Sequence, residues 1–496
     1  MGLAKHDKIR AMVDKFRKLL ANNLTPGSFT RNVLTLMTGT TFSQALLVLV
    51  APILTRIYSP ENFGVYALYT SILSIIAVMS CLRYEHAIVL PEKEKDAANI
   101  LFISLVICFC MTIITLLIIL FFGKTIADIL GSPELAHWLW LMPISLLAVG
   151  LFQILNYWST RRKQFKRLAV RQITRSTATV ISQLGIGIYF PPVNAGGLIG
   201  GDLLGQVVAT SRLAWQIKKE EGRQILNSIQ WNTCKQLLSI YKKFPLYSSW
   251  ASLINTLSAM LPALLLGYFF TPPIVGYFAL AHRVLAMPMG IVGSSLGQVF
   301  FPEAAIKHRQ GNLSEITFKI FEQLVSLCMV PIGLLTIISP ELFGIIFGSN
   351  WVIAGEYVRW LSLWIFFQFI SSPLSTVYIV LEKQQGLLVF NIFLLATRTI
   401  TLVIGGIYNN ATLTIILFGL SGFIMYLFFT VKILNMAGIQ QYRIWSVIGL
   451  KMLKSIPYAL VPVVFRFLFN NSFLFVLSAI LAGVIFLIQL AYTKKN

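Results

Sequence analysis

The chain has 496 residues, of which 56% are hydrophobic and only 12% are charged, whereas a typical soluble domain has about 25% charged residues. Its mean hydropathy is +0.76, and 40 lysines and arginines against 18 acidic residues give a net charge of +22. A water-soluble fold cannot bury this much apolar surface, so the composition excludes a soluble protein. We expect an all-α integral membrane protein.

Residues 1–30 are predicted to form an amphipathic segment on the cytoplasmic side. Ile9, Met12, Phe16 and Leu19 recur at helical spacing, and lysines occupy positions between them. A basic amphipathic helix of this kind lies on an anionic membrane surface. No cleavable signal peptide is evident.

Long apolar stretches follow along the rest of the chain. A spanning helix needs about 20 mostly apolar residues, and we identify about fourteen such stretches. Their approximate limits are 32–54, 63–89, 98–122, 137–158, 169–190, 197–216, 244–270, 275–301, 316–340, 357–381, 386–408, 413–434, 446–468 and 473–492. The longest polar stretch between them, 217–243, is predicted to be a cytoplasmic linker.

Lysine and arginine are concentrated in alternate connections. They gather in the N-terminal arm, in the loop at 161–167 and in the linker at 217–243. Because cytoplasmic loops carry the excess of basic residues, this pattern places both termini and the linker in the cytoplasm. The orientation of the chain in the membrane therefore accounts for most of the positive charge, and we do not expect a nucleic-acid partner.

Two apolar segments resemble each other. "APILTRIYSPENFGVYAL" begins at Ala51 and "LPALLLGYFFTPPIVGYFAL" begins at Leu261, so that Pro52 matches Pro262 and "GVYAL" matches "GYFAL". Such a repeat predicts two parallel six-helix bundles, 31–216 and 244–434, with the last two spans in 435–496 outside the repeat. Chance similarity between apolar helices is the alternative.

Four motifs resemble a known family. "TRIYSPENFGVYAL", "LRYEHAIVLP", "YKKFPLYSS" and "GYFALAHRVLAMPMGIVGSSLGQVFFPEA" are similar to the Wzx polysaccharide flippases of the multidrug/oligosaccharidyl-lipid/polysaccharide (MOP) exporter superfamily. The resemblance implies two lobes around a central cavity plus two additional helices, in a bacterial cytoplasmic membrane. It also implies transfer of an undecaprenyl-diphosphate-linked oligosaccharide from the inner to the outer leaflet, for O-antigen, capsule or another surface polysaccharide. Polysaccharide polymerase or export machinery is a candidate partner.

The sequence leaves other functions open. The alternatives are a peptidoglycan-precursor (lipid II-type) flippase, a multidrug exporter of the same superfamily, and a membrane glycosyltransferase or polymerase. The predicted exterior loops are short and contain few acidic residues, and no P-loop or metal-binding motif is present. We therefore expect a transporter rather than an enzyme. It would need no cofactor, with a proton or sodium gradient as the candidate energy source.

Charged side chains within predicted spans indicate where a charged substrate would bind, because hydrocarbon excludes them unless they are paired or hydrated. Arg283 and Arg398 lie deepest, and Arg175 and Arg83 lie nearer the cytoplasmic side. Our candidates for binding a diphosphate and a glycan are Arg283, Arg398, Arg175, Arg83, Asn255, Gln298 and Gln44. Our candidates for ion coupling are Glu85, Asp202 and His282. Helix packing or purely structural ion pairs are the alternative roles.

Arg83 and Glu85 are expected to belong to one continuous helix from 63 to 89. Residues two positions apart on a helix point about 200° away from each other, so the two side chains are predicted not to pair. Arg83 would then reach inner-leaflet phosphates or an entering diphosphate. Glu85 would face the cavity or a partner helix.

Overall fold

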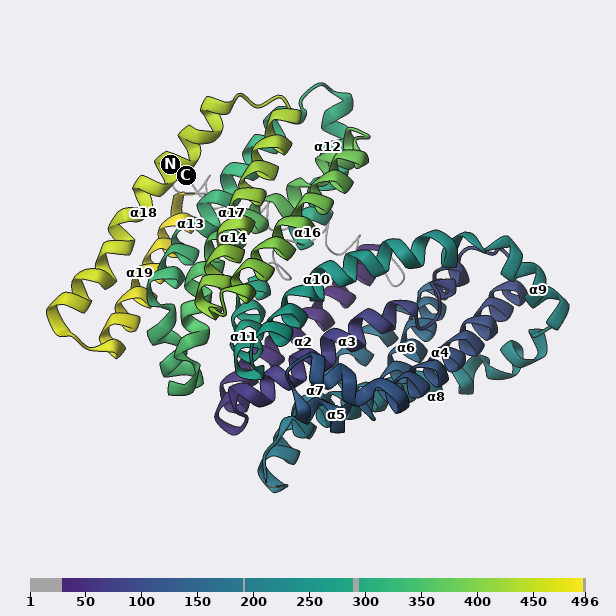
Figure 1. Cartoon of the computed structure of the whole chain (residues 1–496). Coiled ribbons are helices and arrows are strands. Elements are labelled where there is room, and N and C mark those ends of the chain that lie inside the picture. Colours follow the sequence, from purple (N-terminus) through teal and green to yellow (C-terminus); the bar gives the residue numbers. More distant parts are fainter. Residues whose placement is uncertain (1–28, 191, 289–293, 494–496) are drawn as a thin grey trace, which may run out of the picture.

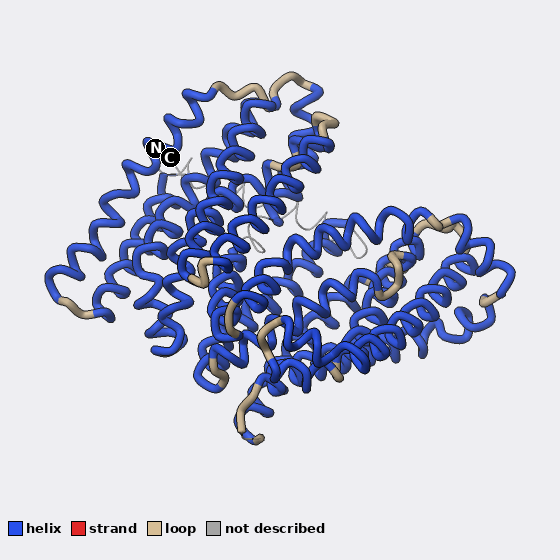
Figure 2. The backbone as a smooth tube through the Cα atoms, viewed as in Figure 1, coloured by secondary structure: helices blue, strands red, loops and turns tan. Residues whose placement is uncertain are grey.

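The computed structural model describes residues 29–190, 192–288 and 294–493, and the regular structure in these ranges is helical (Figures 1 and 2). The predicted amphipathic segment at 1–30 lies almost entirely outside them. The helices are α2 (Phe29–Ile57), α3 (Pro60–Met79), η1 (Tyr84–Val89), α4 (Glu94–Ile129), α5 (Pro133–Leu139), α6 (Met142–Arg161), α7 (Phe165–Tyr189), α8 (Ala195–Ser228), α9 (Trp231–Ile240), η2 (Phe244–Ser248), α10 (Ser249–Phe269), α11 (Pro272–Pro288), α12 (Ser294–Arg309), α13 (Leu313–Phe347), η4 (Ser349–Trp351), α14 (Val352–Leu374), α15 (Val377–Val380), α16 (Gln384–Ile407), α17 (Ala411–Met436), α18 (Gln441–Phe469) and α19 (Ser472–Thr493).

Eleven helical segments among the described residues are long and apolar enough to cross a membrane. The predicted spans at 169–190, 197–216 and 275–301 are not among them, so the count of fourteen is not confirmed. Each exception has a reason in the sequence. Helix α7 carries several arginines, α8 is rich in glycine and continues into a charged segment, and α11 has only 17 residues.

The described helices form two bundles that are inclined to one another (Figure 1). In the first bundle, α7 packs on α2 and α8, and α6 packs on α4 and α8. In the second, α14 packs on α13 and α17, and α16 packs on α17. The last two helices, α18 and α19, pack on each other and on α13. This arrangement is the all-helical, two-lobed fold that the sequence predicts.

The predicted linker at 217–243 is largely helical. Helix α8 continues without a break to Ser228, and α9 follows after two residues. The helical linker is attached to the first bundle. The amide of Asn99 donates to the Ser228 carbonyl oxygen over 2.9 Å, and Arg162 pairs with Glu221 at 3.0 Å. The polar composition of this stretch thus reflects an exposed helical hairpin rather than an irregular loop.

The predicted second span ends early. Helix α3 stops at Met79 rather than at Val89, because Leu82 and Arg83 adopt left-handed backbone conformations with φ values of 48° and 62°. A non-glycine residue in this region cannot continue a right-handed helix. The chain turns and forms the short 3₁₀-helix η1 before α4 begins. The orientation of Arg83 relative to Glu85 therefore cannot follow from one continuous helix.

The two bundles meet within the repeated segments, where α3 and α11 begin. Helix α11 packs along α3, and the N-terminal turns of the two helices contact each other. A Cβ atom on Gly64 would lie 1.8 Å from the Pro272 carbonyl oxygen, and one on Gly276 would lie 2.0 Å from the Pro60 carbonyl oxygen. Glycine is required at both positions because no side-chain atom fits there. The matched motifs thus form a local two-fold contact, which we call the α3–α11 seal.

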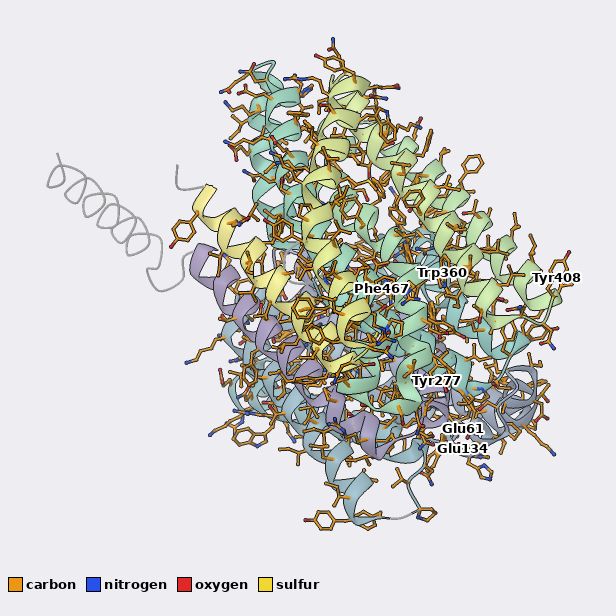
Figure 3. The ribbon with its side chains drawn as sticks, turned by 90° about the vertical axis from the view of Figure 1, so that its left-hand side faces the viewer. Glu61, Glu134, Tyr277, Trp360, Tyr408 and Phe467 are labelled. Atoms are coloured by element: carbon orange, nitrogen blue, oxygen red, sulfur yellow. The ribbon has the colours of Figure 1, made fainter. Side chains whose placement is uncertain are left out.

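Trp351 closes the same end of the molecule. Its indole donates a hydrogen bond over 3.0 Å to the carbonyl oxygen of Thr55 at the end of α2. Its ring packs edge-on against Phe63 of α3 and Tyr277 of α11, at centroid distances of 5.0 and 6.0 Å. Figure 3 labels Glu61 and Tyr277 near this end. A side chain from the second bundle thus fills the space between α2, α3 and α11, at the end predicted to face the exterior.

The seal makes a direct prediction about stability. We expect Gly276→Ala to lower the free energy of unfolding by about 1–3 kcal/mol, because the new methyl group overlaps the Pro60 carbonyl. Gly333→Ala on α13 is the matched control, since its Cβ would meet no atom within 4 Å. Thermal unfolding of the purified protein in detergent measures both. Equal stability of the two variants would contradict the close contact.

Candidate functional site

Charged side chains from both bundles gather where α3, α7, α8 and α11 approach each other. Arg175 of α7 and Asp202 of α8 form an ion pair with 3.4 Å between Nη2 and Oδ1, and their side chains are 37% and 21% exposed. Tyr66 of α3 and Arg283 of α11 line one small cavity, and the Tyr66 hydroxyl also lies near Arg175 and Asp202. We call Tyr66, Arg175, Asp202 and Arg283 the inter-lobe cluster.

A small cavity lies between α3 and α11 at this cluster. Its volume is about 110 Å³, and Tyr66, Thr70 and Arg283 are the polar side chains in its lining. Phe63, which packs on Trp351, forms another part of the wall. The cavity is therefore continuous with the α3–α11 seal. Arg283 forms no ion pair with any residue in the described ranges.

Arg171 adds a third cation, which lies one helical turn from Arg175 on α7. It is only 3% exposed, its guanidinium stacks on Phe152 with 3.3 Å to the ring centroid, and it donates to Gln206 over 2.8 Å. Only one of the three arginines in this region, Arg175, has a carboxylate partner among the described residues. The cluster and its surroundings thus carry excess positive charge, which favours an anionic ligand.

The structure places Arg398 apart from Arg283, although both were predicted to bind the same diphosphate. Arg398 lies inside the second bundle, with its guanidinium 5.0 Å from the ring centroid of Trp364 and 5.7 Å from that of Phe418. It also interacts with Tyr426 of α17. Aromatic faces attract a guanidinium and shield it from hydrocarbon, so this packing fits the structural role that we considered as the alternative, and diphosphate binding by Arg398 stays a prediction.

His282 belongs to the environment of Arg398 rather than to the cluster. Its ring stacks between Phe278 and Trp364, at centroid distances of 5.8 and 6.0 Å. Its sequence neighbour Arg283 lines the cavity against α3. Successive residues of α11 therefore serve different bundles, which the sequence pattern did not reveal.

The three polar candidates do not join the cluster through any contact that the structure describes. Gln44 on α2 and Asn255 on α10 have exposed side chains. Gln298 belongs to α12, and its side chain lies outside the described part. Tyr66 is the cluster residue that the sequence did not suggest. It occurs in "GVYAL", which we interpreted only as a repeat, and nothing in the motif shows that its hydroxyl lies near three charged side chains.

Arg83, Glu85 and His86 form a separate group on η1, outside the spanning helices. Arg83 Nη1 lies 3.8 Å from Glu85 Oε1 and 2.8 Å from His86 Nε2, so the prediction that Arg83 and Glu85 do not pair is wrong. The left-handed turn at Leu82 and Arg83 is the reason. Glu85 is only 1% exposed, and it faces the first bundle, where it interacts with Cys81 and Tyr157. Of the two orientations that we considered, the structure favours a partner helix.

Burial raises the pKa of the Glu85 carboxyl to about 7, and the backbone hydrogen bond and the nearby Arg83 only partly oppose this rise. Burial and Arg83 also lower the pKa of His86. A folded-state pKa above the unfolded value means that the folded protein holds this proton more tightly. The stability that Glu85 contributes is therefore complete below about pH 4.5 and is lost as the pH rises through about 7.

This shift of the Glu85 pKa predicts that the stability of the protein depends on pH. Glu85→Gln should make the stability depend less on pH. The amide resembles the protonated acid, so the variant should unfold at the same or a higher temperature than the parent at pH 8, and the parent should regain stability toward pH 5. Thermal unfolding between pH 5 and 8 tests this expectation. Glu92→Gln, in the exposed turn after η1, is the control. The same pH profile in the parent and in Glu85→Gln would show that Glu85 does not titrate in this range.

The described residues contain no group of three or more histidine, cysteine, aspartate or glutamate side chains that could hold a metal ion.

Solved structures share this fold. The lipid II flippase MurJ in an inward closed conformation superposes with a TM-score of 0.65 at 14% identity, over 94% of this chain and all of that one. An inward-facing multidrug resistance MATE family transporter of the MOP superfamily superposes with a TM-score of 0.61 at 16% identity, over 79% of this chain and 95% of that one. At these identities the likeness shows the fold alone.

Sequence comparison adds a family. The succinoglycan biosynthesis transport protein ExoT of Rhizobium meliloti (strain 1021) is 24% identical over 348 residues, which are 67% of this chain and 65% of ExoT. The match thus spans slightly less than two thirds of the length of that relative. These relatives are a transport protein, a flippase and a transporter, in agreement with the expectation of a transporter rather than an enzyme. Residues 53–356 match the family described as "Polysaccharide biosynthesis protein", so the chain belongs to the polysaccharide biosynthesis protein family and has a MOP-superfamily fold.

Proposed function

We propose that this protein is a flippase that moves undecaprenyl-diphosphate-linked oligosaccharide units from the inner to the outer leaflet of a bacterial cytoplasmic membrane. The observation that carries the proposal is Arg283, a cation without a carboxylate partner among the described residues, in a cavity between the two bundles. A diphosphate needs compensating charge while it crosses the hydrocarbon. The planar guanidinium of arginine binds two phosphate oxygens at once.

The ion pair of Arg175 and Asp202 suits a transient phosphate contact. The two side chains are partly exposed and 3.4 Å apart, so a diphosphate can compete with Asp202 for the guanidinium. When the substrate leaves, Asp202 can pair with Arg175 again. Entry of a proton or a sodium ion at Asp202 would weaken the pair, which makes a gradient of either ion a candidate energy source.

The α3–α11 seal supplies the second element of the proposal. It closes the molecule at the end predicted to be exterior, while the bundles diverge toward α9 and α12 (Figure 1). We infer that the substrate enters from the cytoplasmic side and that opening of the seal releases it to the outer leaflet. Transporters built from repeated bundles alternate access in this way around a fixed site.

Two observations favour this substrate over the other candidates. Family membership and the succinoglycan transport relative support a polysaccharide unit, although a lipid II-type substrate carries the same diphosphate and the MurJ fold fits it. The positive charge of Arg283, which has no carboxylate partner among the described residues, disfavours cationic drugs by repulsion. Polysaccharide polymerase or export machinery is the corresponding candidate partner.

Arg283→Ala tests the proposal. We expect surface polysaccharide, normalised to membrane-inserted protein, to fall at least about tenfold, because removal of a charge-assisted phosphate contact costs about 1.5–3 kcal/mol. Arg283→Lys should restore part of the activity, since the charge remains without the planar fork. Arg283→Glu should be worse than alanine. Arg212→Ala is the control, because Arg212 is an exposed arginine of α8 that contacts Thr174 and lies outside the cluster.

Arg398→Ala provides a contrast within the same experiment. Because Arg398 packs among aromatic side chains inside the second bundle, we expect less folded protein but near-normal polysaccharide per inserted molecule. Normal polysaccharide with Arg283→Ala would refute the role of Arg283 and would direct attention to Arg175 and Arg83.

A further inference from the structure

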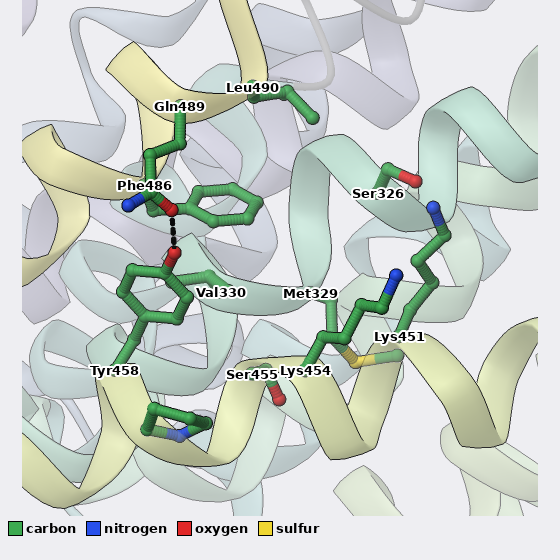
Figure 4. Close-up of a pocket in the computed structure, with 11 residues that line it drawn as sticks. Ser326, Met329, Val330, Lys451, Lys454, Ser455, Tyr458, Phe486, Gln489 and Leu490 are labelled. Atoms are coloured by element: carbon green, nitrogen blue, oxygen red, sulfur yellow. Dashed lines mark hydrogen bonds between the residues drawn. The ribbon is translucent and has the colours of Figure 1, made fainter. Parts of the chain in front are cut away.

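A separate cavity of about 600 Å³ lies between α13, α18 and α19, away from the inter-lobe cluster (Figure 4). It is formed mainly by the two C-terminal helices that lie outside the repeat. Met329, Val330, Phe486 and Leu490 give it an apolar wall. All three helices include candidate membrane spans, so a ligand of this cavity can come directly from the bilayer.

One side of the cavity is basic. Lys451 and Lys454 are one helical turn apart on α18, and both belong to the lining. Lys451 lies 3.4 Å from Glu322 of α13, whereas Lys454 forms no ion pair with a residue in the described ranges. Glu322 therefore pairs with one of the two lysines, and among the described residues the cavity retains a positive charge inside a spanning segment, where an unpaired lysine is costly.

Hydrogen-bonding groups lie beside the lysines. Ser455 is on the same helix, Ser326 lies on α13, and the Tyr458 hydroxyl donates to Gln489 of α19. Figure 4 shows both lysine side chains directed toward the space between α18 and α13. Polar groups thus lie beside the apolar wall in one cavity. This amphiphilic lining suits a ligand with a charged head and a hydrocarbon chain.

The position of the lysines fits a headgroup drawn slightly into the bilayer. The predicted span of α18 begins at residue 446 on the cytoplasmic side, so at 1.5 Å per residue Lys451 lies only about 8 Å inside it. Lysine side chains can extend toward that surface along their flexible stems. Basic pockets between spanning helices on the cytoplasmic side bind the headgroups of anionic lipids.

We propose that this cavity binds an anionic phospholipid of the inner leaflet, with its phosphate at Lys451 and Lys454 and one acyl chain along Met329, Val330 and Phe486. The lipid holds α18 and α19 on α13. The site is independent of the transported substrate, because none of its lining residues belongs to the inter-lobe cluster.

Native mass spectrometry of the full chain tests this proposal with phosphatidylglycerol as the probe and phosphatidylethanolamine as the zwitterionic comparison. We expect preferential retention of phosphatidylglycerol, and about tenfold weaker binding when Lys451→Gln and Lys454→Gln are combined. Glu322→Gln should strengthen binding, because it releases Lys451. Lys319→Gln, an exposed lysine of α13 outside the lining, is the matched control.

Ser455→Phe gives an independent test, because the ring occupies part of the cavity beside the lysines and leaves both lysines in place. It should also weaken phosphatidylglycerol binding. Unchanged preference for phosphatidylglycerol in the double lysine variant and in Ser455→Phe would overturn the proposal. So would loss of undecaprenyl diphosphate binding in these variants with phosphatidylglycerol binding intact, since the cavity would then serve the substrate.

Discussion

The reciprocal contact between the first turns of α3 and α11 is the constraint on which the rest of the architecture depends. Gly64 and Gly276 each sit against a carbonyl of the opposite helix, at Pro272 and Pro60, where no side-chain atom fits. Such a contact fixes both the distance and the angle between the bundles at one end. Because the backbones touch directly, the bundles can separate there only as units. The cavity with Arg283 lies immediately beside this contact.

The hydrocarbon of the membrane excludes charge, and this explains the surroundings of the arginines inside the bundles. Each deep arginine is compensated in its own way. Arg175 has a carboxylate, Arg171 has an amide and an aromatic ring, and Arg398 has aromatic rings and Tyr426. Among the described residues, Arg283 has the neighbouring charges and hydroxyl of the cluster but no carboxylate partner, within a small cavity. An anion that enters between the bundles would complete its environment, and this electrostatic preference for an anion is the physical basis of the proposed function.

Much of the fold could be predicted from the sequence, because apolar length and the distribution of lysine and arginine determine spanning helices and their order. The repeat was also visible, since "GVYAL" and "GYFAL" contain the glycines that the seal requires. The end of α3 was not predictable in this way. Nothing in "CLRYEH" identifies Leu82 and Arg83 as left-handed, and a helical projection through them gave the wrong relation between Arg83 and Glu85.

The candidate site was predictable only in part. Both Arg283 and Arg398 were candidates for binding the diphosphate because both lie deep within a predicted span. Depth alone does not show which bundle a side chain packs against. Packing of His282 on Trp364 and of Arg283 against α3 separates their roles, and both depend on tertiary contacts between distant segments. Tyr66 and the cavity at α13, α18 and α19 likewise arise from contacts that no local pattern encodes.

Alternating opening of the two ends is the central claim, and spin-label distances measure it most directly. One label pair, at Glu61 and Asn350, spans the seal, and another, at Lys235 and Gln310, joins exposed positions at the predicted cytoplasmic ends of the two bundles. The labels are introduced into a variant without the five native cysteines. When a lipid-linked diphosphate oligosaccharide is added in nanodiscs, the first distance should lengthen while the second shortens. Distances that stay unchanged, or that change in the same direction, would contradict the account.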